Sequence, residues 1–400
     1  MPKTLVNIIT EDNPIPAYLF IKEMYQEGDN LMYISAKDTE DDLDALSELF
    51  KVPKDHFHEI VLKHNVDEFT YEKICRTIVG YLNHETQYCV NLAGGTRYMA
   101  LAVQQVFEKF NSEFFYVQVE ENLIVKSAFD DSIYNNDDFF YPINYRMKVP
   151  EYLRAHEIQN DLDSCPHEPI RLREESEYIY RLFIQGMLTD QDYETLELLR
   201  TYYRKLLYVN IFDVQSRGFR NYPPVPGLTD LLVAFNFVSE RNGVLNRREV
   251  EYLTGGWFEE YVYYLVKRRV KPTDIALGVR ISRNNVRHDN ELDVVFTKGN
   301  KLFVIECKTG VQSERLFNEI VYKLCAISEA LLGVSCCSYI FSLKQDETDI
   351  LKKIAANMDI TFVDRAILTS QKKLRKSLAY MYVKSRDGIN SLLKPHTKLH

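Results

Sequence analysis

The chain has 400 residues, 46% of them hydrophobic and 27% charged, which is ordinary for a folded protein of two or three domains. Its net charge of −9 argues against broad, nonspecific coating of nucleic acid. There is no apolar run long enough to span a bilayer and no secretory signal pattern at the amino terminus, so we expect a cytoplasmic protein. The seven cysteines lack C-x-x-C spacing, which indicates neither a disulfide framework nor a zinc site.

The first third of the chain alternates short strands with helices. Strands are predicted at 4–9, 31–35, 60–62 and 88–92, with helices ending near Gln26 and spanning 38–49 and 68–82 between them. A further strand or hairpin is expected over 112–126. This alternation predicts a mostly parallel, doubly wound α/β sheet of the Rossmann kind.

A glycine turn follows the fourth predicted strand. Gly94 and Gly95 allow close approach of a ligand to the backbone, and the helix after them presents free amide groups. The turn matches neither a dinucleotide fingerprint nor a P-loop, and a Gly-Gly turn is often only a tight turn. The loop of residues 10–13 also follows a strand, so both loops can face one pocket at the carboxyl edge of the sheet.

The run from Asn91 through Gly94 to Arg97 resembles the CARF domain, a Rossmann-like sensor of CRISPR-associated proteins. Arg97 stands where that motif often has Lys. The resemblance implies a homodimer that binds a cyclic oligoadenylate across its two-fold axis. The ligand-binding residues expected from it are Thr10, Glu11, Asp12, Asn13, Ser35, Asn91, Gly94, Gly95, Thr96 and Arg97.

The segment from Tyr152 to about Arg248 is predicted to be helical, from apolar residues spaced three and four apart. We expect it to connect a sensor to an effector, with a winged-helix-like part. His156, His167 and Cys165 are too irregularly spaced to predict metal ligands.

Two strands separated by a polar turn are predicted over 290–296 and 301–308, with the turn at 297–300. Side-chain alternation places Glu306 and Lys308 on one face of the second strand, and Asp293 lies across the hairpin. Two converging carboxylates form a hard oxygen site for Mg²⁺ or Mn²⁺, and the lysine can orient water or stabilise charge. The alternative is a structural ion pair.

These residues resemble the PD-(D/E)XK nucleases, which carry an Asp on one strand and Glu-x-Lys on the next. Leu292 stands where the family often has Pro. A further acid on the preceding helix often completes the metal site in that family, and we assign this place to Glu259, predicting that it faces inward and Glu260 does not. The resemblance implies that Glu259, Asp293 and Glu306 hold the metal while Lys308 positions the attacking water.

Several further features bear on the nuclease half. A tail of helices and strands is predicted, with helices over 315–332 and 349–357 and strands over 338–341 and 360–363, as the PD-(D/E)XK core requires. Glu319 and Lys323 are predicted to form a surface pair. Basic residues that could contact nucleic acid, or only form solvated faces, are Lys267, Arg268, Arg269, Lys271, Arg283, Arg287, Lys372, Lys373, Arg375 and Lys376.

The predicted organisation is therefore a CARF-like domain at 1–145, a helical connector at 146–250, a nuclease domain at 251–370 and a basic extension at 371–400. The combination resembles the CARF-fused PD-(D/E)XK nucleases of type III CRISPR systems. It implies a divalent-metal-dependent endonuclease that cleaves DNA, RNA or both when a cyclic oligoadenylate, cyclic tetra-adenylate, binds. The alternatives are a ligand-sensing transcriptional regulator without catalysis and a constitutive restriction or repair nuclease.

Overall fold

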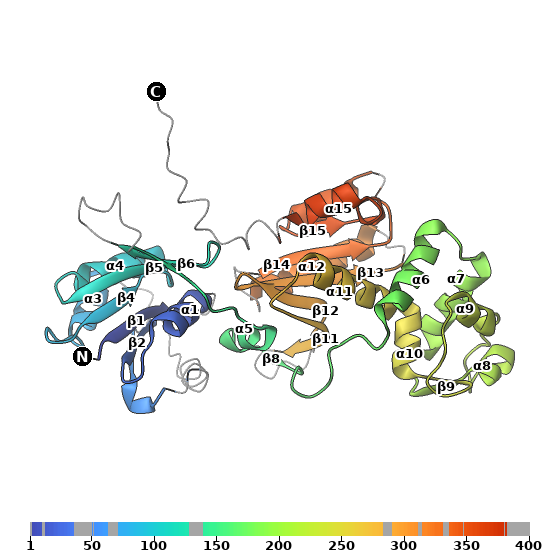
Figure 1. Ribbon diagram of the computed structural model, residues 1–400, viewed down its shortest axis with the longest axis horizontal. Helices are drawn as coiled ribbons and strands as arrows, with labels where there is room; N and C mark the ends of the chain where they lie inside the picture. Colours follow the sequence, from blue (N-terminus) through green and yellow to red (C-terminus); the bar gives the residue numbers. More distant parts are fainter. Residues whose placement is uncertain are drawn as a thin grey trace, which may run out of the picture.

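The computed structural model describes residues 2–9, 13–35, 50, 52–62, 71–127, 139–282, 290–310, 314–330, 336–346, 348–379 and 381. Figure 1 shows three regions along the long axis: the amino-terminal sheet, a second sheet in the centre, and helices at the far side. Within the described residues, no helix is both long and apolar enough to cross a membrane.

The amino-terminal domain contains a seven-stranded sheet of order β3-β2-β1-β4-β5-β6-β7. Its strands are β1 (Thr4–Ile9), β2 (Asn30–Ser35), β3 (Phe57–Val61), β4 (Tyr88–Asn91), β5 (Ser112–Gln118), β6 (Leu123–Ser127) and β7 (Phe140–Pro142). The pairs among β1 to β5 are parallel, and β6 and β7 pair antiparallel. Strand order reverses between β1 and β4, which is where doubly wound sheets bind ligands.

Helices cover both faces of this sheet. They are α1 (Ile15–Met24), α3 (Tyr71–Val79) and α4 (Arg97–Phe107), with the short η1 (Lys54–His56). Buried residues of α1 and those of α3 and α4 belong to different apolar clusters, as expected for opposite faces. The predicted Rossmann-like fold is confirmed; the helix predicted over 38–49 lies outside the described residues.

The central domain is built on a six-stranded sheet of order β15-β14-β13-β12-β11-β8. Its strands are β8 (Gln159–Asn160), β11 (Asp274–Ser282), β12 (Asn290–Lys298), β13 (Lys301–Lys308), β14 (Cys336–Ser342) and β15 (Thr361–Val363). Its helices are α11 (Trp257–Arg269), α12 (Glu314–Ala330), α13 (Ile350–Ala356), α14 (Arg365–Leu368) and α15 (Gln371–Ser377). The strands β13, β14 and β15 run parallel, whereas β11, β12 and β13 form an antiparallel meander.

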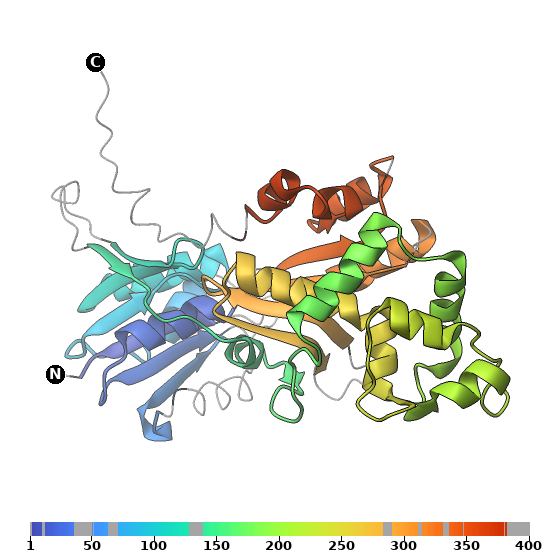
Figure 2. The ribbon, with the colours of Figure 1, turned by 45° about the vertical axis from the view of Figure 1, so that its right-hand side comes forward.

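The connector begins with α5 (Val149–Ala155) and β8, which pairs with β11 and forms the edge of the central sheet. It continues through α6 (Arg173–Gln185), α7 (Asp190–Leu198), η4 (Leu199–Tyr203), β9 (Tyr208–Asn210), α8 (Ile211–Arg217), α9 (Leu228–Ala234), β10 (Val244–Asn246), α10 (Arg247–Glu251) and the π-helical turn η5 (Tyr252–Gly256). In both views, α7 to α10 lie beyond the central domain, on the side away from the amino-terminal domain, whereas α6 packs on α11 (Figures 1 and 2).

The amino-terminal and central domains therefore contact each other directly, through the turn between β12 and β13. Asn300 in this turn is 1% exposed. Its amide nitrogen donates to Asn122 Oδ1 and to the carbonyl of Tyr145, each at 3.0 Å, and its Oδ1 accepts from the backbone of Met147 at 2.9 Å. The ammonium of Lys301 lies 2.7 Å from Glu120 Oε1.

Candidate functional site

The hairpin of β12 and β13 forms the base of the candidate site. Its turn is tighter than predicted, because only Gly299 and Asn300 separate the strands, and their φ angles of 57° and 60° suit a type I′ turn. The antiparallel ladder runs to the pair Val294 and Ile305. The next positions along it are Asp293 and Glu306, so the two acids lie side by side as predicted.

Lys308 lies between these two carboxylates. Its Nζ is 2.6 Å from Glu306 Oε1 and 3.6 Å from Asp293 Oδ2, and Asp293 Oδ2 also accepts the backbone N–H of Cys307 at 2.7 Å. Burial works against the charged amine, but the carboxylates of Asp293 and Glu306 outweigh it and raise the pKa of Lys308. The ammonium is therefore held in an interior ion pair with the site's own acids.

Negative charge exceeds positive charge at this site. Burial, followed by the charge of Glu306, raises the pKa of Asp293 to about 7. Burial, followed by the charge of Asp293, raises the pKa of Glu259 well above its usual range. Since Lys308 offsets only part of this repulsion, the carboxylates form a site that would favour an additional cation.

Helix α11 brings Glu259 to the hairpin. The prediction that only Glu259 faces inward was wrong, because Glu260 is 6% exposed and thus also buried. The Glu260 carboxylate accepts the backbone N–H groups of Ile170 at 2.7 Å and Arg171 at 3.3 Å and the hydroxyl of Ser176 at 3.3 Å. Glu259 faces the hairpin and Glu260 the connector, so the two neighbours serve different contacts.

Arg200 from η4 fixes the start of this helix against the hairpin. Its Nε and Nη2 donate to the carbonyl of Thr254 in η5, at 3.2 and 2.8 Å. The same Nη2 donates to Thr309 Oγ1 at 3.2 Å, directly after Lys308. The guanidinium thus joins the segment before Glu259 to the end of β13, a role that the sequence alone did not suggest.

Glu291 is a further acid that the sequence analysis missed. Its charge contributes to the raised pKa values of Glu259 and Asp293, and it lines a pocket together with Glu259. It lies two residues before Asp293 on β12, so alternation along the strand could have identified it as a neighbour on the same face.

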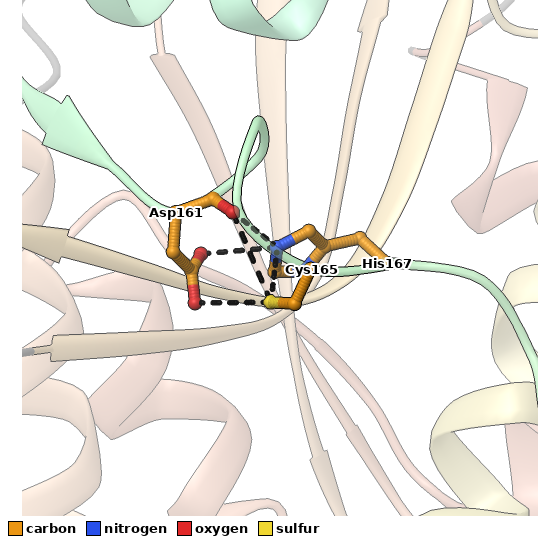
Figure 3. Close-up of side chains that lie close together, drawn as sticks. All are labelled: Asp161, Cys165 and His167. Carbon is orange, nitrogen blue, oxygen red and sulfur yellow. Dashed lines mark hydrogen bonds and ion pairs between the residues drawn. The ribbon is translucent and has the colours of Figure 1, made fainter.

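The donor set suits a hard divalent cation, since Glu259, Asp293 and Glu306 all offer carboxylate oxygens. The ammonium of Lys308 lies beside two of them. Among the described residues, a group of three ligand atoms all within 4.8 Å of one another occurs only at Asp161, Cys165 and His167. The three acids are thus spaced more widely than that cluster. Cys165 and His167, which the sequence did not predict as ligands, lie together with Asp161 (Figure 3).

The basic run Lys267, Arg268 and Arg269 lies at the end of α11 opposite to Glu259. Arg268 lies 3.5 Å from Glu177, and Arg269 donates to Gln371 at 2.9 Å. This run is therefore tied to neighbouring helices and does not flank the acids.

Two further predictions concerned surface charges: an ion pair at Glu319 and a set of basic residues. Glu319 pairs with Arg315 at 3.3 Å instead of the expected Lys323. Arg283 and Arg287, two of the predicted basic residues, lie outside the described residues.

The glycine turn of the amino-terminal domain packs closely on β1. A Cβ at Gly94 would lie 2.3 Å from the carbonyl oxygen of Ile8, and one at Gly95 would lie 2.4 Å from Ile8 Cγ2. Gly95 also has a φ of +64°, which favours glycine. Both glycines are thus required by packing, and the turn leads into α4 beside the end of β1.

The polar residues around this turn divide into exposed and internal groups. Thr96 caps α4 by accepting the N–H of Met99 at 3.2 Å, and Arg97 is exposed at the first position of that helix. Asn91 is buried, and its amide donates to Asn7 Oδ1 at 3.1 Å and to the carbonyl of Pro16 at 3.4 Å.

Of the remaining predicted sensor residues, the structure describes Ser35 and Asn13. Ser35 is buried at the end of β2, where its hydroxyl donates to Glu59 at 3.3 Å. The buried Oδ1 of Asn13 has no partner among the described residues. Thr10, Glu11 and Asp12 lie outside them.

The fold defines a class: a Rossmann-like domain joined to a mixed α/β domain that carries a lysine between two acids on one hairpin. Residues 4–152 match the family model of the Card1 CARF domain, and residues 246–379 match that of the Card1-like endonuclease domain. The chain is therefore a CARF-domain protein of the CRISPR-associated type fused to an endonuclease, as the sequence resemblance implied.

Solved structures agree with this fold. Protein VC1899 from Vibrio cholerae superimposes with a TM-score of 0.69 at 19% identity, covering 96% of this chain and 99% of the other. Can2 from Sulfobacillus thermosulfidooxidans, in complex with cyclic tetra-adenylate, gives 0.64 at 20% identity, with 96% and 99% covered. A type III CRISPR defence DNA nuclease activated by cyclic oligoadenylate gives 0.51 at 12% identity, with 95% and 52% covered. No curated protein sequence matches the chain.

Proposed function

We propose that this endonuclease is of the PD-(D/E)XK type and uses Mg²⁺ or Mn²⁺ to cleave DNA, RNA or both in type III CRISPR antiviral defence. The observation that carries the proposal is the placement of Asp293, Glu306 and Lys308 together on one hairpin, with Glu259 delivered by α11. A divalent cation at these acids would polarise the scissile phosphate and lower the pKa of a bound water.

The chain's own residues supply the rest of the chemistry. Glu259, Asp293 and Glu306 would hold the cation. Bound there, it would relieve the repulsion among their negative charges, which favours binding. Lys308 would position the attacking water or stabilise the negative charge that develops on the phosphate. Both roles require the amine to stay charged, which its raised pKa ensures.

Cleavage assays with Glu306→Gln test this site. Labelled single-stranded DNA, plasmid and single-stranded RNA are incubated with Mn²⁺ or Mg²⁺, with and without each cyclic oligoadenylate. We expect the variant to lose cleavage by ~100-fold or more, while ligand binding stays unchanged. The matched control is Glu319→Gln, an exposed glutamate of the same domain that should cleave as the wild type does. Full cleavage by Glu306→Gln would remove the nuclease site from this hairpin.

We further propose that the sensor binds cyclic tetra-adenylate in a homodimer. The reversal of strand order between β1 and β4, the glycine turn and the exposed Arg97 support an anionic ligand at this edge. The unpartnered Oδ1 of Asn13 supplies an acceptor for a ribose hydroxyl or an adenine amine. The ligand activates only if it binds the cleavage-competent dimer more tightly than the resting one.

Calorimetry with Arg97→Ala tests the sensor site. We expect roughly a 10- to 100-fold loss of affinity for the cyclic oligoadenylate, since a charged hydrogen bond contributes on the order of 1.5–3 kcal/mol. Lys109→Ala, an exposed cation just after the other end of α4, is the control and should bind normally. Light scattering reports the dimer independently, and a monomer that binds the ligand would contradict the two-fold site.

A further inference from the structure

A cluster of three potential metal ligands lies where the connector crosses the edge of the nuclease sheet (Figure 3). The Sγ of Cys165 lies 3.3 Å from Nε2 of His167 and 3.7 Å from Oδ2 of Asp161. The same His167 nitrogen lies 3.1 Å from Oδ1 of Asp161. The three side chains come from one seven-residue segment, which follows β8 directly.

The hydrogen bonds of His167 direct its Nε2 toward the other two side chains of the cluster. Its Nδ1 lies 2.7 Å from the carbonyl of Leu277 on β11, so the Nδ1 proton donates there. Nε2 then faces two oxygens of Asp161, the carboxylate and the main-chain carbonyl, both at 3.1 Å. In a ring with this tautomer, the Nε2 lone pair is directed at the Asp161 oxygens and the Cys165 sulfur, and one metal ion bound to all three side chains would use that lone pair.

The spacing of the three ligand atoms fits a metal ion. Tetrahedral zinc with bonds of about 2.0–2.3 Å to nitrogen, oxygen and sulfur keeps its ligand atoms roughly 3.3–3.8 Å apart. The observed separations of 3.1, 3.3 and 3.7 Å lie at or just below this range. A carbonyl that accepts from the opposite ring nitrogen is the usual outer partner of a metal-bound histidine.

The second coordination layer is also in place at Asp161. Its Oδ1 accepts the backbone N–H of Arg280 on β11 at 2.9 Å, which orients the carboxylate. His167 is held to Leu277 on the same strand. Two of the three ligands are thus positioned by β11, and the side chain of His167 is only 7% exposed.

We propose that Asp161, Cys165 and His167 bind one Zn²⁺ ion, separate from the hard-cation site of the nuclease. The mixed sulfur, nitrogen and oxygen donors favour zinc over Mg²⁺ or Mn²⁺, which prefer oxygen ligands. Binding releases the thiol proton of Cys165 to solvent and leaves the imidazole neutral. The fourth position opens to the pocket that these residues share with Glu259 and Glu291. The ion fastens the connector to β11 beside the catalytic helix.

Cobalt substitution tests the site without relying on activity. The full-length chain, carrying Asp293→Asn and Glu306→Gln to silence the nuclease site, is stripped with a chelator under reducing conditions and titrated with Co²⁺. We expect one equivalent to produce a thiolate-to-cobalt charge-transfer band and the visible bands of a tetrahedral ion. Zn²⁺ should then displace Co²⁺ with a stoichiometry of one per chain.

Variants assign the band to particular ligands. Cys165→Ser should abolish the charge-transfer band, and His167→Gln should weaken Zn²⁺ affinity by more than about 10-fold. Cys75→Ser, a thiol of the sensor domain that faces the carbonyl of Ala102, is the control and should keep both. The proposal is overturned if the parent protein shows no thiolate band at one equivalent, or if the Cys165 and His167 variants bind Zn²⁺ unchanged. A cluster held by hydrogen bonds alone predicts that result.

Discussion

At Asp293, the protein holds a carboxyl group whose ionisation is costly when no metal is bound. Burial and the charge of Glu306 raise its pKa from an ordinary 3.8 to about 7. As pH rises through this window, the unfolded chain releases the proton first, so the folded state loses stability. Above about pH 7 the cost is fully present, and below the ordinary value it vanishes.

Asp293→Asn should therefore stabilise the metal-free protein at pH 8 while abolishing cleavage. The gain is a few kcal/mol at most, because each pKa unit corresponds to about 1.4 kcal/mol. Thermal unfolding with a chelator, from pH 4 to pH 8, measures it, and the difference from wild type should grow with pH. If Asp293→Asn were less stable than wild type by the same amount at every pH, ionisation of Asp293 would not cost the folded protein stability.

Lys308→Met should have the opposite effect on the metal-free protein. Removing the ammonium leaves Asp293 and Glu306 facing each other without their partner, and breaking a buried pair costs roughly 3–5 kcal/mol. Added Mn²⁺ should restore much of the stability but not cleavage. Lys323→Met, an exposed lysine on α12, is the control and should unfold as the wild type does.

At the scale of elements, helix α11 shows what periodicity can and cannot predict. Helical spacing correctly placed Glu259 on a face that packs against the hairpin. The prediction assumed that the helix has only one buried face, whereas Glu260 is buried on another. The helix is covered by the hairpin on one side and by the connector on the other, where Glu260 binds the main chain at Ile170 and Arg171. A second covering segment 90 residues away cannot be read from the pattern of the helix itself.

These neighbouring glutamates provide a paired experiment. Glu259→Gln should abolish cleavage with little loss of stability, since it removes a raised-pKa carboxyl from beside Asp293. Glu260→Gln should retain catalytic chemistry but lose roughly 1–3 kcal/mol, because the amide cannot accept all the hydrogen bonds of the carboxylate. Denaturant unfolding and cleavage of one substrate measure both. If Glu259→Gln lost stability and kept cleavage while Glu260→Gln lost cleavage, Glu260 would be the catalytic acid and Glu259 the structural one.

The hairpin was predictable because its information is local. Alternation along two β-rich runs placed Asp293, Glu306 and Lys308 correctly with respect to each other. By contrast, β8 has two residues and exists only because it pairs with β11, which was also not predicted. The cluster of Asp161, Cys165 and His167 depends on that pairing, so its irregular spacing in sequence concealed it.

At the scale of the whole molecule, only the first part of the segment expected to link sensor and effector, α5 and β8, lies between them. Helices α7 to α10 pack beyond the nuclease sheet, whereas the sensor touches the hairpin of β12 and β13 itself (Figure 1). The same two strands thus carry Asp293 and Glu306 at one end and the sensor contact at the other. A shift of the sensor on ligand binding would reach the acids along β12 and β13.

Asn300→Gly should weaken this coupling. Glycine keeps the positive φ of 60° but removes all three side-chain hydrogen bonds to the sensor and the connector. We expect the ratio of cleavage with and without cyclic oligoadenylate to fall about 5-fold or more, which corresponds to ~1 kcal/mol of coupling. Ligand affinity and unfolding should be measured in parallel.

The matched control is Asn236→Gly, an exposed asparagine that also has positive φ but lies in the connector. It should activate normally. An unchanged activation ratio in Asn300→Gly would show that the signal does not pass through the turn.

The buried turn also constrains how such proteins can be recombined. Hairpin tips usually accept inserted tags or peptides. Here the hairpin tip at Asn300 is buried against the amino-terminal domain, so an insertion would separate the sensor domain from the nuclease domain. A chimera that receives its sensor from another source must therefore reproduce partners for the Asn300 amide and the Lys301 amine. We expect a chimera to respond to its ligand when the new sensor domain offers contacts to Asn300 and Lys301, whatever the length of the connecting chain.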